Sequence, residues 1–226
     1  MKPDDANVPY VAIPVKDNFL YTQALVTSLI EQGEISPAQI HIYDNGSVDE
    51  TKAEMESLGV TVIDAFGWSF HRMWNHALAS GNGLPVGILN NDIAIGPNFL
   101  SSMAAALETD KSLAVVCPNY DDRSGEMNYV ANIQAGRMDG TGGIAGWAYM
   151  IAGDWAQDFR FPEELNWWYG DNVLVDSIVM AGRKCGITGA TTVVHLDGGS
   201  RTGNWTADMV EPDRIWYEQW RNGFRA

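Results

Sequence analysis

The sequence is poor in cysteine and in basic residues, and each shortage argues against a class of protein. Its two cysteines, Cys117 and Cys185, lie far apart and neither belongs to a CxxC pair, so they form no disulfide framework or recognisable zinc site. We expect both to be buried free thiols. Only 14 basic residues stand against 29 acidic ones, and the formal net charge is -15 at pH 7. This charge disfavours broad contact with nucleic acid or with an anionic membrane.

Long apolar runs are also missing. No uninterrupted apolar stretch reaches membrane-spanning length, and the N-terminus MKPDDANVPY lacks a basic flank followed by an apolar core. We therefore predict a soluble, cytoplasmic protein without a membrane span. No charge block, low-complexity tract or internal repeat marks a linker, and 226 residues with 46% hydrophobic content suffice for one large domain.

The chain does contain an alternation of short apolar runs with helical patterns. Four runs predict buried strands at 10–15, 40–43, 60–63 and 86–89. Between them, apolar periodicity predicts helices over 20–30, 52–57 and 70–78, the second of them capped by Ser47. Such alternation implies an α/β fold, a Rossmann-like domain with a mostly parallel sheet flanked by helices.

Carboxylates follow three of the predicted strands. Asp17, Asp44 and Asp92 each fall just beyond a strand end, and Asp92 closes the polar run Asn90-Asn91-Asp92 within ILNNDIAIG. Each could be an ordinary turn residue, because Asp and Asn are common turn formers after a strand. Ligands of α/β folds bind beyond the carboxyl ends of the strands, so the joint placement favours a shared binding edge.

These motifs, in this order, resemble the family 2 glycosyltransferases of the GT-A fold. The resemblance rests on VAIPVKDNFLYTQALVTSLIEQ, on IHIYDNGSVDET and on ILNNDIAI, which is similar to the family's DXD motif with Asn90 in place of the first aspartate. It covers about residues 8–200 and implies a GT-A domain over 1–205. It also implies an inverting transfer of a hexosyl or related sugar from a nucleoside-diphosphate sugar to a hydroxyl acceptor, with Mn²⁺ or Mg²⁺ as cofactor.

The resemblance assigns donor-binding roles to residues at the strand ends. Asp44 would accept a hydrogen bond from the nucleotide base, and Pro14 and Asp17 would border that base. Asn90 would face the ribose. Asn91, the next residue, would also bind the donor.

Two residues are implied as metal ligands. Asp92 would hold the cation, since Mg²⁺ and Mn²⁺ prefer oxygen ligands. His195 ends a β-branched run in VVHLDGGSRTG and resembles the family's late metal-binding histidine. The alternative is a histidine satisfied by local hydrogen bonds. Arg201, after the glycine-rich turn, is the expected phosphate contact.

Further donor contacts are expected from the middle of the chain. Arg72, in WSFHRMWNHAL, would touch the base or the diphosphate, and Asn75 matches a recurrent asparagine of the family. Trp147, in GGIAGWAYM, would border the donor sugar.

Transfer to a hydroxyl needs a base that removes the acceptor proton. PEELNWWYGDNVLVDSIVMAG resembles the base-bearing region of the family, and it assigns this task to Asp171 at the start of a helix over 173–181. Gly170 stands where a second acid often sits. The alternative for Asp171 is a simple helix cap. Trp167 and Trp168 would present flat faces to an acceptor sugar.

The segment 206–226 has the pattern of an amphipathic helix with Ile215, Trp216, Trp220 and Phe224 on its apolar side. We expect it to pack on the GT-A domain or on a dimer mate, so a homodimer stays open.

Three other functions would also suit an α/β fold with carboxylates at its strand ends. A dinucleotide-dependent oxidoreductase would need GxGxxG after the first strand, and a nucleotidyltransferase a glycine- and basic-rich phosphate loop; PVKDN is neither. A non-catalytic sugar- or nucleotide-binding module of the same fold is harder to dismiss from residues alone.

Overall fold

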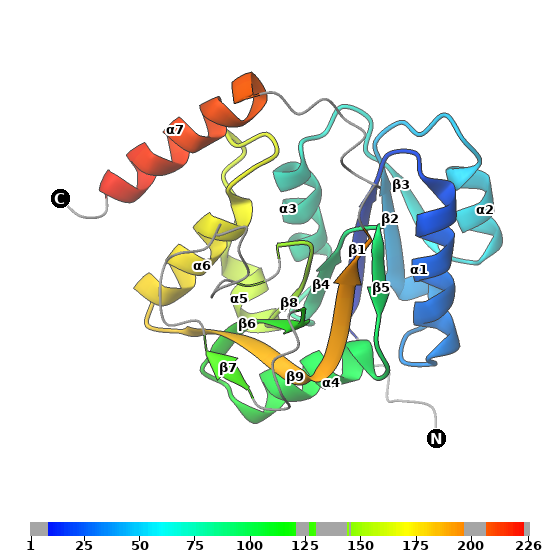
Figure 1. The fold of residues 1–226 in the computed structure, drawn as a ribbon, viewed down its shortest axis with the longest axis horizontal. Coiled ribbons are helices and arrows are strands. Elements are labelled where there is room, and N and C mark those ends of the chain that lie inside the picture. Colours follow the sequence, from blue (N-terminus) through cyan, green and yellow to red (C-terminus); the bar gives the residue numbers. More distant parts are fainter. Residues whose placement is uncertain (1–8, 121–126, 130–143, 145, 197–206, 224–226) are drawn as a thin grey trace.

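The computed structural model describes residues 9–120, 127–129, 144, 146–196 and 207–223, and it has a central sheet with helices on both faces (Figure 1). The first half of the chain forms, in order, β1 (Tyr10–Val15), α1 (Phe19–Glu31), the short helix η2 (Pro37–Gln39), β2 (Ile40–Asp44), α2 (Thr51–Ser57), β3 (Thr61–Asp64), α3 (Phe70–Ser80) and β4 (Val86–Leu89). The second half forms β5 (Ile93–Ile95), α4 (Phe99–Thr109), β6 (Leu113–Asn119), β7 (Asn128–Tyr129), β8 (Ala148–Ile151), α5 (Gly153–Asp158), α6 (Gly170–Met180), β9 (Lys184–His195) and α7 (Ala207–Gly223).

The α/β class and the elements predicted up to Leu89 are confirmed, with ends that move by one or two residues. The predicted helix cap is wrong. Helix α2 has Glu50 at its N-cap position. Ser47 lies in the preceding loop, where its hydroxyl accepts a hydrogen bond from Asp17 N at 2.8 Å. Ser47 therefore joins two loops instead of starting a helix.

The strand order is β3-β2-β1-β4-β8-β6-β9-β5, with β7 beside β9. Strands β1 to β4 are parallel, as the alternation predicts. β8 runs antiparallel to β4 and β6, and β5 and β7 run antiparallel to β9, so the complete sheet is mixed. After β4 the strict alternation of strand and helix stops at β5, and apolar patterning no longer dictates parallel neighbours.

The sheet separates two apolar layers, as successive side chains of β1 illustrate. Val11 and Ile13 pack on one face with residues of α1, α2 and α4, whereas Tyr10 and Ala12 pack on the other with residues of α3, α5 and α6. This is the period of two expected for a strand buried on both faces. Both cysteines are buried and free, as predicted.

Helix α7 lies against α6, away from the centre of the sheet (Figure 1). A small cluster built on Leu165, Val173 and Tyr217 joins the two helices and the segment between α5 and α6. Trp216 and Trp220 pack on this cluster, as the amphipathic pattern predicts, but Ile215 is 42% exposed. Phe224 lies outside the described residues. Among the described helices, none combines the length and the apolar character needed to cross a membrane.

Candidate active site

A polar network ties the loops after β1 and β2 together at the carboxyl edge of the sheet. Asp17 Oδ1 accepts a hydrogen bond from Val48 N at 2.8 Å, and Asp17 N donates to Ser47 Oγ at 2.8 Å. Asp49 Oδ2 accepts from Phe19 N at 3.0 Å. The parallel pairing of β1 with β2 brings these loops side by side. Asp17 therefore shapes the edge at which the donor base is predicted to bind.

Asp44 ends β2 and is 8% exposed. Its Oδ1 accepts a hydrogen bond from Ser47 N at 2.8 Å, so the carboxylate does have the turn-forming role considered as an alternative. Pro14 is buried in β1, opposite Tyr43 of β2. Contact of Asp44 and Pro14 with a nucleotide base stays a prediction.

The two asparagines after β4 have different surroundings. Asn90 is half-buried and its backbone N–H donates to Trp147 O at 2.8 Å. Asn91 Nδ2 donates to Thr22 Oγ1 of α1 at 3.0 Å. The side chain of Asn91 thus helps to hold α1 on the sheet, and this contact gives its predicted donor role no support.

The pairing of β5 with β9 brings Asp92 and His195 together from distant parts of the chain. Ile93 lies opposite His195, and Leu196 N donates to Asp92 O at 2.8 Å. His195 Nε2 lies 3.2 Å from Asp92 Oδ1, with the two side chains 28% and 2% exposed. Within the described part of the chain, His195 Nε2 is buried and has no partner at hydrogen-bond geometry. The predicted metal ligands are therefore neighbours.

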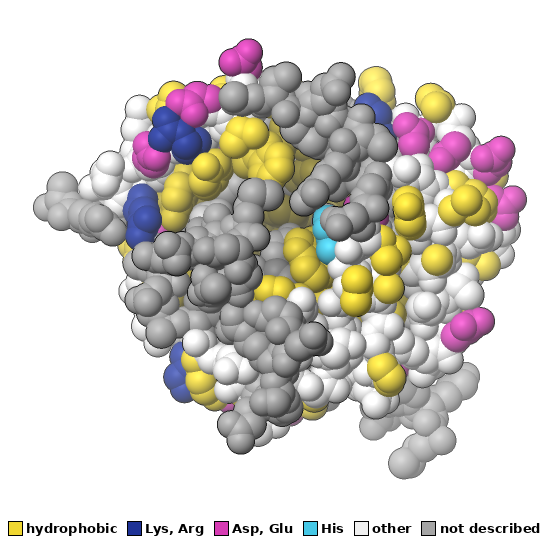
Figure 2. Space-filling model, viewed as in Figure 1, with side chains coloured by type: hydrophobic (Ala, Val, Ile, Leu, Met, Phe, Trp, Pro, Cys, Tyr) yellow, Lys and Arg dark blue, Asp and Glu magenta, His cyan; other side chains and the backbone are white. Residues whose placement is uncertain are grey.

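Trp147 contacts both His195 and Asn90, the residue that follows β4. Its ring stacks on His195, with ring centroids 5.1 Å apart and an interplanar angle of 22°. Its carbonyl accepts the hydrogen bond from Asn90 described above. Figure 2 shows that this face of the molecule is hollowed, with hydrophobic side chains in the hollow and a histidine, in cyan, at its edge. Contact of Trp147 with the donor sugar stays a prediction.

Asp171 lies in the first turn of α6, while Tyr169 occupies the N-cap position. Its carboxylate packs against Gly146, next to Trp147: a Cβ added at Gly146 would be only 2.4 Å from Asp171 Oδ2. Burial raises the pKa of the Asp171 carboxyl, although Asn172 N donates a hydrogen bond to Oδ1 at 2.9 Å. Asp171 is therefore not the N-cap of this helix. A raised pKa and a contact with Gly146, the residue before Trp147, suit a base.

Trp167 and Trp168 are half-buried in the segment that leads into α6. The ring of Trp167 meets Phe70 edge-on at a centroid distance of 4.8 Å. The backbone N–H groups of both tryptophans donate to Asp213 Oδ2 of α7, at 2.8 and 2.9 Å. The predicted acceptor platform is thus held by helix α7.

The predicted contacts on α3 and after β9 are less well supported. Arg72 is exposed and its guanidinium lies over the ring of Trp68 at 4.5 Å. Asn75 Nδ2 donates to Phe161 O at 2.8 Å, and Phe161 N donates to Asn75 Oδ1 at 2.7 Å. These bonds hold the segment after α5 on α3. Arg201 lies outside the described residues.

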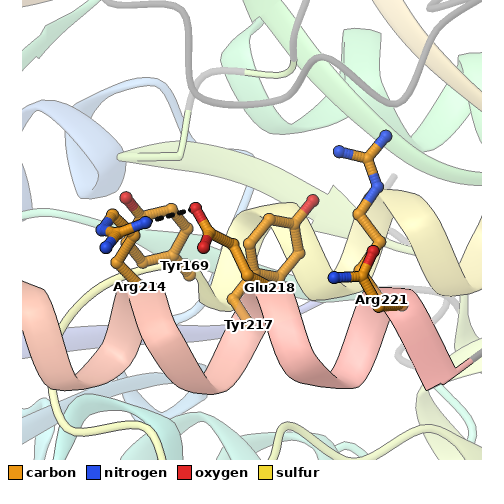
Figure 3. A pocket seen from close by; sticks show the side chains of 6 residues that line it. Tyr169, Arg214, Tyr217, Glu218 and Arg221 are labelled. Carbon is orange, nitrogen blue, oxygen red and sulfur yellow. Dashed lines mark hydrogen bonds and ion pairs between the residues drawn. The ribbon is translucent and has the colours of Figure 1, made fainter.

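A cavity of about 360 Å³ lies between the start of α6 and α7 (Figure 3), lined by Tyr169, Arg214, Tyr217, Glu218, Arg221 and Asn222. Its charged groups are largely paired. Arg214 binds Glu211 and Glu218, and Arg221 Nε lies 3.4 Å from the buried Asp176. Because the charged side chains that line the cavity already bind one another, few of them are left to recognise a ligand. We propose no ligand for this cavity.

Sequence comparison identifies the family of this fold. The model described as Glycosyl transferase family 2 matches residues 10–184, from β1 to the start of β9. The chain belongs to glycosyl transferase family 2. No curated protein sequence matched it.

Solved structures share the fold of this family 2 domain. One is GalNAc-T7 with UDP, GalNAc and Mn²⁺, with a TM-score of 0.68, 14% identity, and coverage of 96% of this chain and 50% of that one. Glucosyl-3-phosphoglycerate synthase from Mycobacterium tuberculosis, in complex with Mn²⁺, UDP and glucosyl-3-phosphoglycerate, has a TM-score of 0.60, 14% identity, and coverage of 92% and 77%. S. aureus TarS 1–349 gives a TM-score of 0.57, 18% identity, and coverage of 84% and 58%.

These likenesses confirm the predicted GT-A fold, and the family match confirms the predicted membership of glycosyl transferase family 2. The family 2 domain spans about half the length of the GalNAc-T7 chain that it matches, at 50%.

Two contributors to the site escaped sequence reasoning. Gly146 matters because its missing side chain leaves room for Asp171. Asp213 carried one usable signal: it stands three, four and seven residues before Trp216, Tyr217 and Trp220, so it shares their helix face. A carboxylate on an apolar face needs a buried partner, which here is the backbone of 166–168.

Proposed function

We propose that this family 2 domain is a metal-dependent, inverting glycosyltransferase that moves a sugar from a nucleoside-diphosphate donor to a hydroxyl acceptor. One observation carries the proposal. Asp92 and His195, predicted as metal ligands, lie 3.2 Å apart beside Trp147, whose neighbour Gly146 packs on Asp171. Because Gly146 and Trp147 are adjacent in the chain, we infer that the candidate metal pair and the candidate base serve one site.

The pair fits a divalent cation. In an octahedral site with metal–oxygen distances of about 2.0–2.1 Å, adjacent ligand atoms lie about 3 Å apart. One carboxylate and one imidazole suit Mn²⁺ better than Mg²⁺, which is more selective for oxygen. No group of three His, Cys, Asp or Glu side chains suited to a metal occurs among the described residues, so the donor's diphosphate would complete the coordination.

The proposed reaction has two parts, departure of the diphosphate and attack by the acceptor hydroxyl. When bound, the cation would neutralise charge on the departing diphosphate. Asp171 accepts the proton of the acceptor hydroxyl while the oxygen forms a bond to the anomeric carbon. The bond from that carbon to the diphosphate oxygen breaks, and the nucleoside diphosphate leaves with the electron pair. A single displacement of this kind inverts the configuration.

UDP is the first nucleotide to test, because GalNAc-T7 and the glucosyl-3-phosphoglycerate synthase were both solved with UDP and Mn²⁺. Asp44 and Pro14 would meet its base, Trp147 its sugar, and Trp167 and Trp168 the acceptor. A cytoplasmic location and a homodimer remain predictions from the sequence.

A panel of nucleoside-diphosphate sugars, incubated with Mn²⁺ or with a chelator, tests the proposal through release of free nucleoside diphosphate. We expect Mn²⁺-dependent release from at least one donor, and faster release when a sugar acceptor is added. Tight Mn²⁺-dependent donor binding without any release would instead support a non-catalytic module. Formation of a nucleotide sugar and pyrophosphate from a nucleoside triphosphate and a sugar phosphate would indicate a nucleotidyltransferase.

A further inference from the structure

We propose that Asp213 of α7 is a positioning residue, whose buried carboxylate fixes the segment 165–171 and so places Asp171 and the two tryptophans before it. The inference rests on the proposed function, since it concerns the base and the acceptor platform of that reaction.

Asp213 is 1% exposed and points into a turn of the main chain. Its Oδ1 accepts from Asn166 N at 3.0 Å, while Oδ2 accepts from Trp167 N at 2.8 Å and Trp168 N at 2.9 Å. Three consecutive backbone N–H groups thus converge on one carboxylate. Such a concave set of amides is an anion-binding nest, here filled by a side chain from a helix more than forty residues further along.

The rest of the segment is held just as closely. Leu165 O lies 2.9 Å from His71 Nδ1, a buried side chain of α3. Gly170 packs so tightly that an added Cβ would lie 2.3 Å from His71 Nε2 and 2.8 Å from Trp74. Asp171 follows at once and meets Gly146. Every anchor of this segment therefore fixes the position from which Asp171 would act.

Tyr169 shows that the main chain is forced into this path. Its φ of 65° is left-handed, a conformation that is costly for a bulky residue and persists only where the surroundings impose it. Its ring stacks on Tyr217 of α7 at a centroid distance of 5.2 Å. Figure 3 shows both side chains at the cavity between α6 and α7. Helix α7 thus holds both the amides before Tyr169 and the ring of Tyr169 itself.

The proposal requires a carboxylate at position 213. Asparagine has nearly the same shape, but one of its two terminal atoms is an amide nitrogen, which donates hydrogen bonds. In Asp213→Asn, the nitrogen would face backbone N–H groups, so the nest would lose at least one bond and its compensating charge. A shift of about 1 Å in a catalytic group can lower a rate by on the order of 10²-fold.

Tyr217→Phe is the matched control. Tyr217 OH donates to the buried Asp176 at 2.9 Å, so its loss loosens α7 on α6 but leaves the amides of 166–168 on Asp213. Both full-length variants are compared with the parent well below their melting temperatures. Three quantities are measured: affinity for UDP with Mn²⁺, the rate of UDP release from a UDP-sugar, and backbone hydrogen exchange of 163–171 by mass spectrometry.

We expect Asp213→Asn to keep UDP affinity within about twofold, to lose on the order of 10²-fold in UDP release, and to exchange faster at 166–168. Tyr217→Phe should stay close to the parent in the rate and in exchange at those amides. Equal losses in both variants, or an unchanged rate in Asp213→Asn, would overturn the proposal.

Hydrogen exchange of the parent covers the case in which Asp213→Asn does not fold. Slow exchange at 166–168 supports the nest, and exchange as fast as in an unstructured peptide overturns it. A parent that releases no UDP from any UDP-sugar would count against the proposed function alone, because the exchange comparison does not depend on turnover.

Discussion

Four aspartates of this domain differ in task because they differ in surroundings. Asp44 bonds a turn amide at the end of β2, and Asp92 lies almost fully buried beside His195. Asp213 fills a nest of three amides. Burial raises the pKa of the Asp171 carboxyl, which suits a group that must take up a proton. The same side chain thus has different roles that depend on its burial and its hydrogen-bond partners.

The first prediction concerns the pair Asp92 and His195. Asp92→Ala and His195→Ala should each lower the Mn²⁺-dependent affinity for UDP by on the order of 10- to 100-fold, because each removes one ligand from a site with few protein ligands. Calorimetric titration of UDP, with Mn²⁺ and with a chelator, measures the effect. Asp64→Ala is the control, since Asp64 is an exposed carboxylate at the end of β3. Unchanged affinity in both site variants would rule out the metal assignment.

The second prediction concerns Asp44, which both bonds Ser47 and is expected to meet the base. Asp44→Ala should weaken UDP binding by about 1–3 kcal/mol, as for a hydrogen bond to a charged group, while inorganic diphosphate with Mn²⁺ binds as before. Asp44→Asn can still accept from Ser47 N, so it should lose UDP affinity with a smaller fall in melting temperature. Parallel losses for UDP and for inorganic diphosphate would place Asp44 elsewhere in the reaction.

At the scale of elements, two packing relations build the site. The β5–β9 register joins Asp92 to His195, and the contact of α3 with the start of α6 fixes the main chain beside Asp171. The second relation depends on Gly170, which has no room for a side chain. Gly170 occupies the position where the family often has a second acid, and here the close approach of His71 and Trp74 gives a physical reason for glycine.

Gly170→Ala tests this packing. The new methyl group would collide with His71 and Trp74, which are 0% and 6% exposed and cannot move aside freely. We expect a loss of about 1–3 kcal/mol in the free energy of unfolding, the usual cost of overpacking. Gly223→Ala is the control, because nothing lies within 4 Å of a Cβ there. Denaturant unfolding should separate the two variants; equal stability would contradict the described contact.

The elements that depend on local sequence patterns could be predicted from the sequence. Strands β1 to β4 are short, mainly apolar runs separated by helical periods, so both their bounds and their parallel direction could be predicted. The direction of β8 and the partners of β9 depend on contacts between distant residues, which periodicity does not encode. The pairing of Asp92 with His195 could be expected from family resemblance alone. A buried partner for Asp213 could be expected from its place on an apolar helix face, but the three amides that bind it could not, because any residue except proline supplies a backbone N–H.

For the whole molecule, the dominant feature is the formal net charge of -15 at pH 7. Repulsion among like charges destabilises a compact state, and salt screens it. Raising NaCl from about 10 mM to about 150 mM at pH 7 should therefore raise the melting temperature by about 2–4 °C. Near the sequence pI of about 4.4 the same salt step should have little effect. A melting temperature that falls with salt at pH 7 would show that attractive ion pairs dominate instead.

The most direct test of the proposed reaction is the comparison of Asp171→Asn with the parent, with donor affinity and turnover measured on one preparation. Asn has the size of Asp but cannot accept the proton. The variant should bind UDP with Mn²⁺ as the parent does, while its rate of transfer falls by on the order of 10²- to 10⁴-fold.

The pH profile of the same two proteins completes this measurement. A base works only when ionised, and burial raises the pKa of Asp171, so the parent's rate should fall with decreasing pH through a limb above the ordinary carboxyl pKa of about 3.9. The variant should lack that limb. Turnover of Asp171→Asn within a few-fold of the parent, with the acid limb intact, would contradict the account and place the base elsewhere.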